Sequence, residues 1–233
     1  SILLVEDSVR YYSTYLPELY RMVLRQSSEF LKETLNEQQR KNMKRSRPKI
    51  LLATNLDDAM AMYEKYKSNL LGVISDVGFC EHRGGKPEEE KLDAGLNLVR
   101  HIKADDPKMP ILLQSSQDSI CPVAEELGVG FLRKYSKTLM IQLYDYIKEE
   151  FAFGDFIFRD ADRVEYGRAA NLKELEVLMR EIPEDILLAN TSKNMLSKWF
   201  MARGLFTLGA KFKKLPETHP PNAAELRAYV SQQ

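Results

Sequence analysis

The sequence is poor in cysteine: Cys80 and Cys121 are the two among its 233 residues. Two cysteines exclude a disulfide framework and are too few for a cysteine-rich metal site. No apolar run approaches the roughly 18 residues that a membrane-spanning helix needs. We therefore expect a cytoplasmic protein without a membrane partner.

An excess of one charge sign is also missing, because 34 Lys and Arg balance 34 Asp and Glu. Bulk electrostatics therefore favour neither nucleic acid nor an anionic membrane as a partner. The sequence has no glycine-rich phosphate loop of the P-loop type and no visible signal peptide. Because it begins without Met and directly on a strand pattern, we expect a trimmed chain or a piece of a longer one.

The first 150 residues alternate between apolar runs of strand length and amphipathic helical patterns. The runs occupy 2–5, 50–54, 71–75, 111–115 and 129–132. Most of them are apolar on both faces, as the central strands of parallel sheets are. The helical patterns between and after them lie at 57–67, 94–106, 123–128 and 136–151, with Asn55 or Asp57 as the N-cap of the first and Ser136 of the last.

Alternation of this kind predicts an α/β fold, a doubly wound five-stranded parallel sheet with helices on both faces. Two stretches of the sequence are longer than a minimal fold of this kind requires. Residues 9–46 carry a helical pattern much longer than the roughly 12–15 residues that cover one face of a sheet, with a kink or break expected at Pro17. Residues 79–93 are expected to be an exposed, mobile loop inserted into the domain.

The predicted domains are 1–150, built on this sheet, and 151–233, a small and mainly helical C-terminal module. A strand at 154–160, a helix at 171–182 and two helices in 191–215 hinged near Gly204 are expected in the module. Its basic residues leave two alternatives open, a DNA-binding helix pair and a helical face for protein contacts. Trp199, Phe200, Leu205, Phe206, Leu208 and Phe212 favour packing over a DNA-binding turn.

Residues suited to chemistry stand at four of the predicted strand ends. Glu6 and Asp7 follow the first strand, Asp76 the third, Ser115 ends the fourth, and Lys134 follows the fifth. The carboxyl ends of parallel strands open onto one edge of the sheet, so these side chains should converge there. A lone acid at a strand end is usually a helix cap, but five suitable residues at the correct ends are hard to explain as caps.

This pattern resembles the receiver domain of two-component response regulators. The stretches that carry the resemblance are ILLVEDS (2–8), VISDVGF (73–79), LDAGLNLVRHIK (92–103), MPILLQSSQ (109–117) and GVGFLRK (128–134). It covers residues 2 to about 150 and implies a flavodoxin-like fold in a phosphorelay. A histidine kinase or phosphotransfer protein would be the phosphoryl donor.

The resemblance implies a role for each acid of the cluster. Glu6, Asp7 and Asp76 would hold one Mg²⁺, a hard cation that prefers oxygen ligands, together with the carbonyl of Gly78. Asp76 would then accept the phosphoryl group as a carboxylate nucleophile. Lys134 would neutralise the charge of that group.

Further roles concern the phosphorylated state. Ser115 would hydrogen-bond the phosphoryl group, with Ser116 as the alternative hydroxyl if the register differs by one. Phe131 would rotate and change the surface that partners contact. Gly78 and Gln117 would tune how fast water removes the phosphoryl group.

The sequence departs from the family pattern in several places. Tyr135 stands where the family usually has Pro, the Met-Pro that usually follows the phosphorylated Asp is absent, the loop before Asp93 is longer by about 11 residues and the first helix is roughly doubled in length. These departures concern the switching surface and dimerisation, and none removes a catalytic group. The apolar stripe of the long first helix favours either packing on the C-terminal region or a two-stranded coil, hence a homodimer.

Several other features have a plainer interpretation beside a functional one. His82 is expected to be a solvated loop residue rather than a ligand. The acidic run at 88–90 is expected to be a solvated loop, the alternative being that it repels phosphate. Tyr11, Tyr12, Tyr15 and Tyr20 are expected in the core or in an interface rather than in a ligand cage.

The order of segments across nearly the whole chain is similar to the N-terminal region of bacterial proteins related to phosphoenolpyruvate synthase and pyruvate phosphate dikinase. That resemblance implies a fused or partner metabolic enzyme as the regulated protein. We expect a signalling protein and no enzyme with an external substrate. The alternatives are a DNA-binding response regulator and a metal-dependent phosphatase.

Overall fold

The structure is a computed structural model that describes residues 1–31, 47–85, 89–192, 195–218, 224 and 227. These residues divide into two compact units: unit 1 contains residues 1–25 and 48–151, and unit 2 contains residues 26–31, 47 and those from 152 onward. The domains 1–150 and 151–233 remain a prediction, because compactness does not show that a part folds alone. Among the described helices, none has the length and apolarity needed to cross a membrane.

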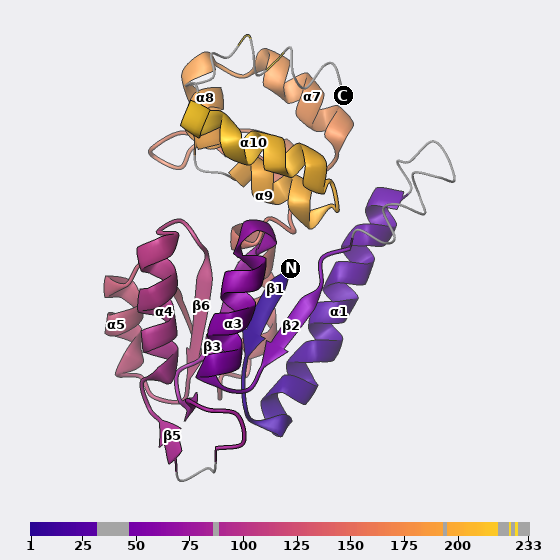
Figure 1. Ribbon diagram of the computed structural model, residues 1–233. Helices are drawn as coiled ribbons and strands as arrows, with labels where there is room; N and C mark the ends of the chain where they lie inside the picture. The colour runs from indigo at the N-terminus through magenta and orange to yellow at the C-terminus, as the bar shows by residue number, and fades with distance from the viewer. Residues whose placement is uncertain (32–46, 86–88, 193–194, 219–223, 225–226, 228–233) are drawn as a thin grey trace. The chain divides into compact units, whose positions relative to one another are not determined.

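Unit 1 is built on a parallel sheet (Figure 1) with the strand order β2-β1-β3-β6-β7. Each neighbouring pair runs parallel. The strands are β1 (Ile2–Val5), β2 (Ile50–Ala53), β3 (Gly72–Asp76), β6 (Ile111–Ser115) and β7 (Gly130–Arg133). This is the flavodoxin-like order of doubly wound sheets, which confirms the predicted fold class.

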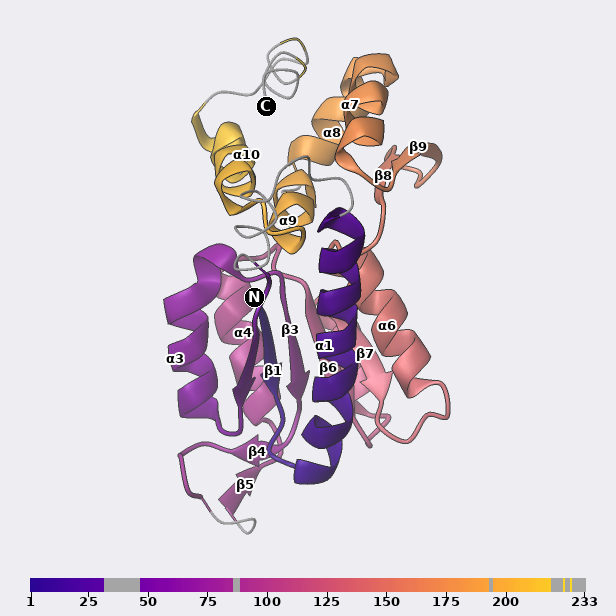
Figure 2. The same ribbon diagram turned by 90° about the vertical axis from the view of Figure 1, so that its right-hand side faces the viewer.

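Among the described residues, five helices cover the two faces of this sheet. They are α1 (Val9–Leu31), α3 (Leu56–Tyr66), which continues into the 3₁₀ turn η1 (Lys67–Asn69), α4 (Ala94–Asp105), α5 (Ile120–Glu126) and α6 (Leu139–Glu150). Buried residues of α3, α4 and α5, such as Tyr63, Val99 and Ala124, belong to one core cluster with the strands. The helices α1 and α6 cover the opposite face (Figure 2).

Local signals explain where some of these helices begin. Asn55 caps α3 as predicted, because its Oδ1 accepts a hydrogen bond of 2.8 Å from the backbone N–H of Asp58. The Ser136 cap is wrong, since α6 begins at Leu139. The hydroxyl oxygen of Ser136 instead accepts a 3.2 Å hydrogen bond from the backbone N–H of Thr138 and closes a local turn before the helix.

The first helix runs through Pro17, so the alternative of a break at this residue is wrong. Tyr15 and Leu19, on either side of the proline, are both buried within unit 1, and tertiary packing outweighs the loss of one backbone hydrogen bond. Val23 is buried there as well. The remainder of the predicted helix, residues 32–46, lies outside the described residues.

The insertion at 79–93 is mostly exposed in its described residues, as expected, but its ends have regular structure that was not predicted. Its ends form a two-stranded antiparallel sheet of β4 (Phe79–Cys80) and β5 (Glu90–Lys91). Phe79 is fully buried in the core of unit 1, and burial of its ring fixes the start of the insertion. Residues 86–88 lie outside the described part of the chain.

Unit 2 combines one β-hairpin with helices. The elements are β8 (Phe156–Arg159), β9 (Glu165–Ala169), α7 (Leu172–Glu181), α8 (Glu184–Ser192), α9 (Met195–Ala202) and α10 (Phe206–Thr218). The hinge near Gly204 is confirmed, because this residue separates α9 from α10 and has a φ of +79° that favours glycine. The strand β9 and the helix α8 were not predicted.

Three of the four aromatic residues of the helix pair lie in the core of unit 2, as predicted, whereas Phe206 is partly exposed and outside this cluster. Trp199, Phe200 and Phe212 are buried in one cluster. Arg203 is buried beside them, with its guanidinium 3.6 Å from the centroid of the Trp199 ring. Its nitrogens donate hydrogen bonds to the carbonyl oxygens of Ala152 and Gly154, so this cation is part of the packing.

Candidate functional site

Two acids and a lysine meet at the carboxyl edge of the sheet in unit 1. Glu6 directly follows β1, Asp76 is the last residue of β3, and Lys134 directly follows β7. The Nζ of Lys134 lies 2.8 Å from Oε2 and 3.1 Å from Oε1 of Glu6, and it also donates to Oδ2 of Asp76. The predicted convergence of strand ends therefore brings these three side chains into direct contact.

Asp7 completes a cluster of three acids. One carboxylate oxygen from each of Glu6, Asp7 and Asp76 lies within 4.8 Å of the others. With all three ionised and Lys134 protonated, three negative charges face one positive charge, which leaves a net charge of −2. Such a cluster attracts a divalent cation.

Burial and mutual repulsion alter the protonation of these groups. Burial, followed by the charge of Asp76, raises the pKa of Glu6 to about 7, although Lys134 opposes the change. Burial also raises the pKa of Asp7, and the charges of Asp76 and Glu90 add to the effect. Burial alone would lower the pKa of Lys134, but the charges of Asp76 and Glu6 outweigh it and raise the pKa.

The donor set fits Mg²⁺ by its chemistry. Carboxylates are the hard oxygen ligands that this ion prefers, and three of them face one another here. Asp7 and Asp76 are partly exposed, so water molecules can complete the coordination. Because Lys134 already contacts Glu6 and Asp76, it shares these carboxylates with any bound cation.

The structure places the remaining predicted site residues on β6, on β7 and in the loops that follow β3 and β6. Ser115 ends β6 beside β7, and its backbone oxygen accepts a 3.0 Å hydrogen bond from the N–H of Lys134. Its hydroxyl accepts a 3.1 Å hydrogen bond from the N–H of Gln117, whose side chain is exposed. Phe131 on β7 is partly buried against the core, and Gly78 lies two residues beyond Asp76. Their roles in the proposed chemistry remain predictions.

Close packing explains why glycine stands at position 95, near the start of α4. The N–H of Gly95 donates a 2.8 Å hydrogen bond to the carbonyl oxygen of Val77. A Cβ at this position would lie 2.8 Å from the Cα of Val77, 3.0 Å from the carbonyl carbon of Asp76 and closer still to the oxygen. Glycine therefore lets α4 approach the backbone that carries Asp76.

Three residues near the cluster were not predicted to take part in the site. The ring centroid of Tyr11 lies 4.2 Å from the Nζ of Lys134, a cation–π distance. Tyr15 is buried, and burial followed by the charge of Glu6 raises the pKa of its hydroxyl. Both stand on α1 at four-residue spacing, a signal of one helix face that the sequence does contain.

Glu90 is the third unpredicted neighbour. It comes from β5 in the insertion, and its Oε1 lies 2.5 Å from the place that a Cβ of Gly78 would take. The sequence carries no sign of this approach, because the contact depends on how the inserted hairpin folds back.

No protein-family model and no curated protein matches this sequence. Among solved structures, the chain is similar to the crystal structure of a response regulator receiver domain protein from Clostridium thermocellum, with a TM-score of 0.37 and 16% identity. The match covers 63% of this chain and 93% of that chain. The fold assignment rests on the strand order and parallel pairing of the sheet, not on this likeness.

Proposed function

We propose that this chain is a phosphoacceptor signalling protein of the response-regulator type, which takes a phosphoryl group on Asp76 with Mg²⁺. The observation that carries the proposal is the meeting of Glu6, Asp7 and Asp76 with Lys134 at the carboxyl edge of a flavodoxin-like sheet. A nucleophilic carboxylate, cation-binding acids and a lysine are the parts that phosphoryl transfer to a protein acid requires.

In the proposed reaction, an oxygen of the Asp76 carboxylate attacks phosphorus of a phosphohistidine on a histidine kinase or phosphotransfer protein. The P–N bond breaks, its electron pair stays on the imidazole, and an aspartyl phosphate forms. When bound, Mg²⁺ offsets the repulsion between the carboxylate and the incoming phosphoryl group. A small donor such as acetyl phosphate reacts in the same way and releases acetate.

The other residues hold the groups in place. The Oδ1 of Asp76 accepts a 2.7 Å hydrogen bond from the N–H of Val77, which orients the carboxylate and leaves Oδ2 beside Lys134. On phosphorylation, Lys134 exchanges this contact for the phosphoryl oxygens. Ser115 binds the same group, and Phe131 follows by rotating on β7. Water ends the signal by attacking phosphorus, which releases inorganic phosphate and restores the carboxylate.

The output of the proposed protein is regulation by protein–protein contact. A fused or partner metabolic enzyme is the proposed target, from the similarity of the segment order to proteins related to phosphoenolpyruvate synthase, a similarity that no comparison supports. A homodimer through the first helix stays a prediction as well.

The proposal is tested by intact-mass spectrometry of the full chain after incubation with acetyl phosphate and MgCl₂. The wild type should gain one phosphoryl group, which hydroxylamine removes and EDTA prevents. Asp76→Asn should gain none. A folded wild type that gains no mass, or an Asp76→Asn variant that gains as much, would refute the proposal.

The same protein also tests the alternatives. Steady turnover of a free phosphoester such as p-nitrophenyl phosphate would favour the metal-dependent phosphatase. Salt-dependent binding to duplex DNA, weakened by Lys211→Ala or Lys213→Ala, would favour the DNA-binding regulator. The proposed function predicts neither result.

A further inference from the structure

The insertion at 79–93 is held against the rest of unit 1 at both of its ends. Phe79 anchors it in the core, and the two short strands pair Phe79 with Lys91 and Cys80 with Glu90. The segment that returns to the sheet edge is therefore fixed by main-chain pairing. Its last residues lead directly into α4, which begins at Ala94.

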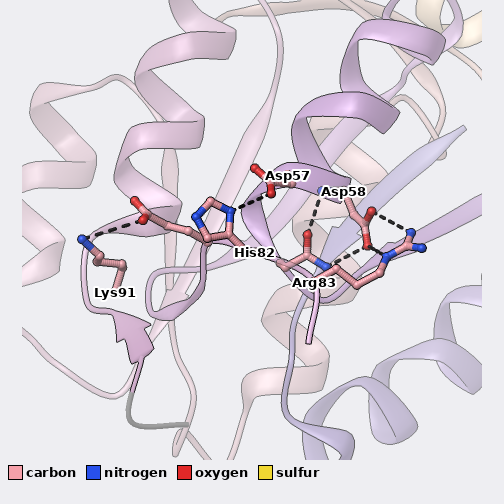
Figure 3. Close-up of polar contacts among 7 residues, drawn as sticks. Asp57, Asp58, His82, Arg83 and Lys91 are labelled. Carbon is pink, nitrogen blue, oxygen red and sulfur yellow. Dashed lines mark hydrogen bonds and ion pairs between the residues drawn. The ribbon is translucent and has the colours of Figure 1, made fainter. Parts of the chain in front are cut away.

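The outer part of the insertion is fastened to the start of α3 (Figure 3). The Nδ1 of His82 lies 2.8 Å from a carboxylate oxygen of Asp57, and the His82 side chain is 78% exposed, so it is a solvated loop residue, as expected, that also pairs with this acid. The guanidinium of Arg83 lies 2.9 Å from a carboxylate oxygen of Asp58. The N–H of Asp57 donates a 3.0 Å hydrogen bond to the carbonyl oxygen of Glu81. These three contacts, two between side chains and one between backbone groups, limit where the insertion can lie.

This placement brings a fourth carboxylate next to Gly78, two residues beyond Asp76. Oε1 of Glu90 occupies the space of a side chain at position 78, since it lies 2.5 Å from where a Cβ of Gly78 would be. Its charge acts on Asp7, whose pKa it helps to raise. The Glu90 carboxylate therefore acts on Asp7, whereas the ammonium of Lys134 contacts Glu6 and Asp76.

We propose that Glu90 makes the inserted hairpin part of the cation site: its carboxylate accepts hydrogen bonds from the water around a divalent cation held by Glu6, Asp7 and Asp76. This inference rests on the proposed function and adds a residue to the same site. Glycine at position 78 and glutamate at position 90 act as a pair, because the first leaves the space that the second fills.

Charge explains why the proposed contact of the Glu90 carboxylate depends on a bound cation. Without a cation, a fourth carboxylate adds repulsion to a cluster whose net charge is already negative. With a divalent cation present, the same carboxylate is attracted, and its hydrogen bonds to water orient the ligand set. Cation binding should therefore also steady the hairpin that carries Glu90.

The expected effect on affinity follows from the usual cost of losing such a hydrogen-bonding partner, about 10- to 100-fold in metal affinity. Glu90 is exposed, so solvent screens its charge, and we expect the lower end, about tenfold. The neighbouring Glu89 is exposed too and offers a matched control for the loss of one charge from the same segment.

The test is isothermal titration of the full chain with MgCl₂ alone, comparing the wild type with Glu90→Gln and Glu89→Gln. Glu90→Gln should bind about tenfold more weakly, and Glu89→Gln should differ less than about twofold from the wild type. Gly78→Ala, which pushes the carboxylate aside, should weaken binding in the same direction. In hydrogen exchange, Mg²⁺ should slow the amides of 79–85 and 89–91 in the wild type, and less so in Glu90→Gln.

The outcomes separate this inference from the function on which it rests. Equal or tighter binding by Glu90→Gln, or an equal loss in Glu89→Gln, would overturn the role of Glu90 and leave the phosphoacceptor proposal intact. A wild type that binds no Mg²⁺ would refute the cation site itself, and both proposals with it. Without Mg²⁺, the β3 amides of Glu90→Gln should exchange as slowly as those of the wild type, and this comparison checks that the variant folds.

Discussion

Gly95→Ala should destabilise unit 1 although alanine is the better helix former. The added Cβ would lie 2.8 Å from the Cα of Val77 and 3.0 Å from the carbonyl carbon of Asp76. Backbone atoms cannot rotate away as the end of a side chain can, so either α4 or the end of β3 must shift. Overpacking of this kind costs roughly 1–3 kcal/mol, and the contact is with backbone, which places Gly95→Ala at the upper end.

Two opposing terms set the net effect. Replacing glycine by alanine within a helix gains up to about 1 kcal/mol. Subtracting this gain from about 3 kcal/mol of strain leaves a loss of about 2 kcal/mol in the free energy of unfolding. Gly78→Ala is the matched control: its Cβ would meet Oε1 of Glu90, the end of a flexible side chain, and its stability should stay within about 0.5 kcal/mol of the wild type.

The assay is hydrogen exchange of the β3 amides in the full chain at increasing urea, which reports on unit 1 directly. Displacement of the Asp76 backbone should also slow labelling by acetyl phosphate, by about tenfold to a hundredfold, since a shift of about 1 Å in a reacting group has that effect. A Gly95→Ala protein as stable as the wild type would refute the close approach of α4 to this strand end.

Three further predictions follow from individual contacts. Lys134→Met removes the counter-charge of the buried Glu6 and the partly exposed Asp76, and should lower the free energy of unfolding by about 3 kcal/mol at pH 8. The loss should be smaller at pH 6, because burial raises the pKa of Glu6 to about 7 and this carboxylate then takes up a proton in the folded state. Urea unfolding without Mg²⁺ at both pH values measures the loss. The hydrogen bond with Asp57 raises the pKa of His82. The stabilisation from this contact is therefore fully present below the ordinary histidine pKa and is lost as the pH rises through the raised value. An NMR titration should show a lower pKa of His82 in Asp57→Asn, and an unchanged pKa would contradict the pairing. The side chain of Asn190 donates 2.7 Å hydrogen bonds to the carbonyl oxygens of Arg159 and Ile186 and is almost fully buried; Asn190→Ala should lower the stability of unit 2 by about 1–3 kcal/mol, which the fluorescence of the single tryptophan reports during unfolding.

The sheet of unit 1 could be predicted because each of its strands is a short run of residues apolar on both faces. Val5, Val73 and Leu113 are fully buried, and this pattern is what central parallel strands require. The position of the site at the carboxyl edge of the sheet could then be predicted from the topology. Glu6, Asp76 and Lys134 could be brought together without knowledge of any distance, because parallel strands end at the same edge.

Contacts that depend on tertiary placement could not be predicted in this way. Phe79 and Glu90 belong to the inserted segment, and nothing local indicates that the first is buried and that the second approaches Gly78. The strand β9 was missed because most of its residues are exposed and polar, so its pairing with β8 is not visible in the pattern. The cation–π contact between Tyr11 and Lys134 could not be predicted either. The helical spacing of Tyr11 predicts which face of the helix it lies on, but not that Lys134 packs against that face.

The central claim is that Asp76 is the residue that accepts the phosphoryl group, and reductive trapping tests it at that residue. Borohydride converts an aspartyl phosphate to homoserine, and peptide mapping locates the product. After incubation with acetyl phosphate and MgCl₂, homoserine should appear at position 76 and should be absent when EDTA replaces MgCl₂. Trapping at another acid, or none in a folded and Mg²⁺-loaded protein, would contradict the account.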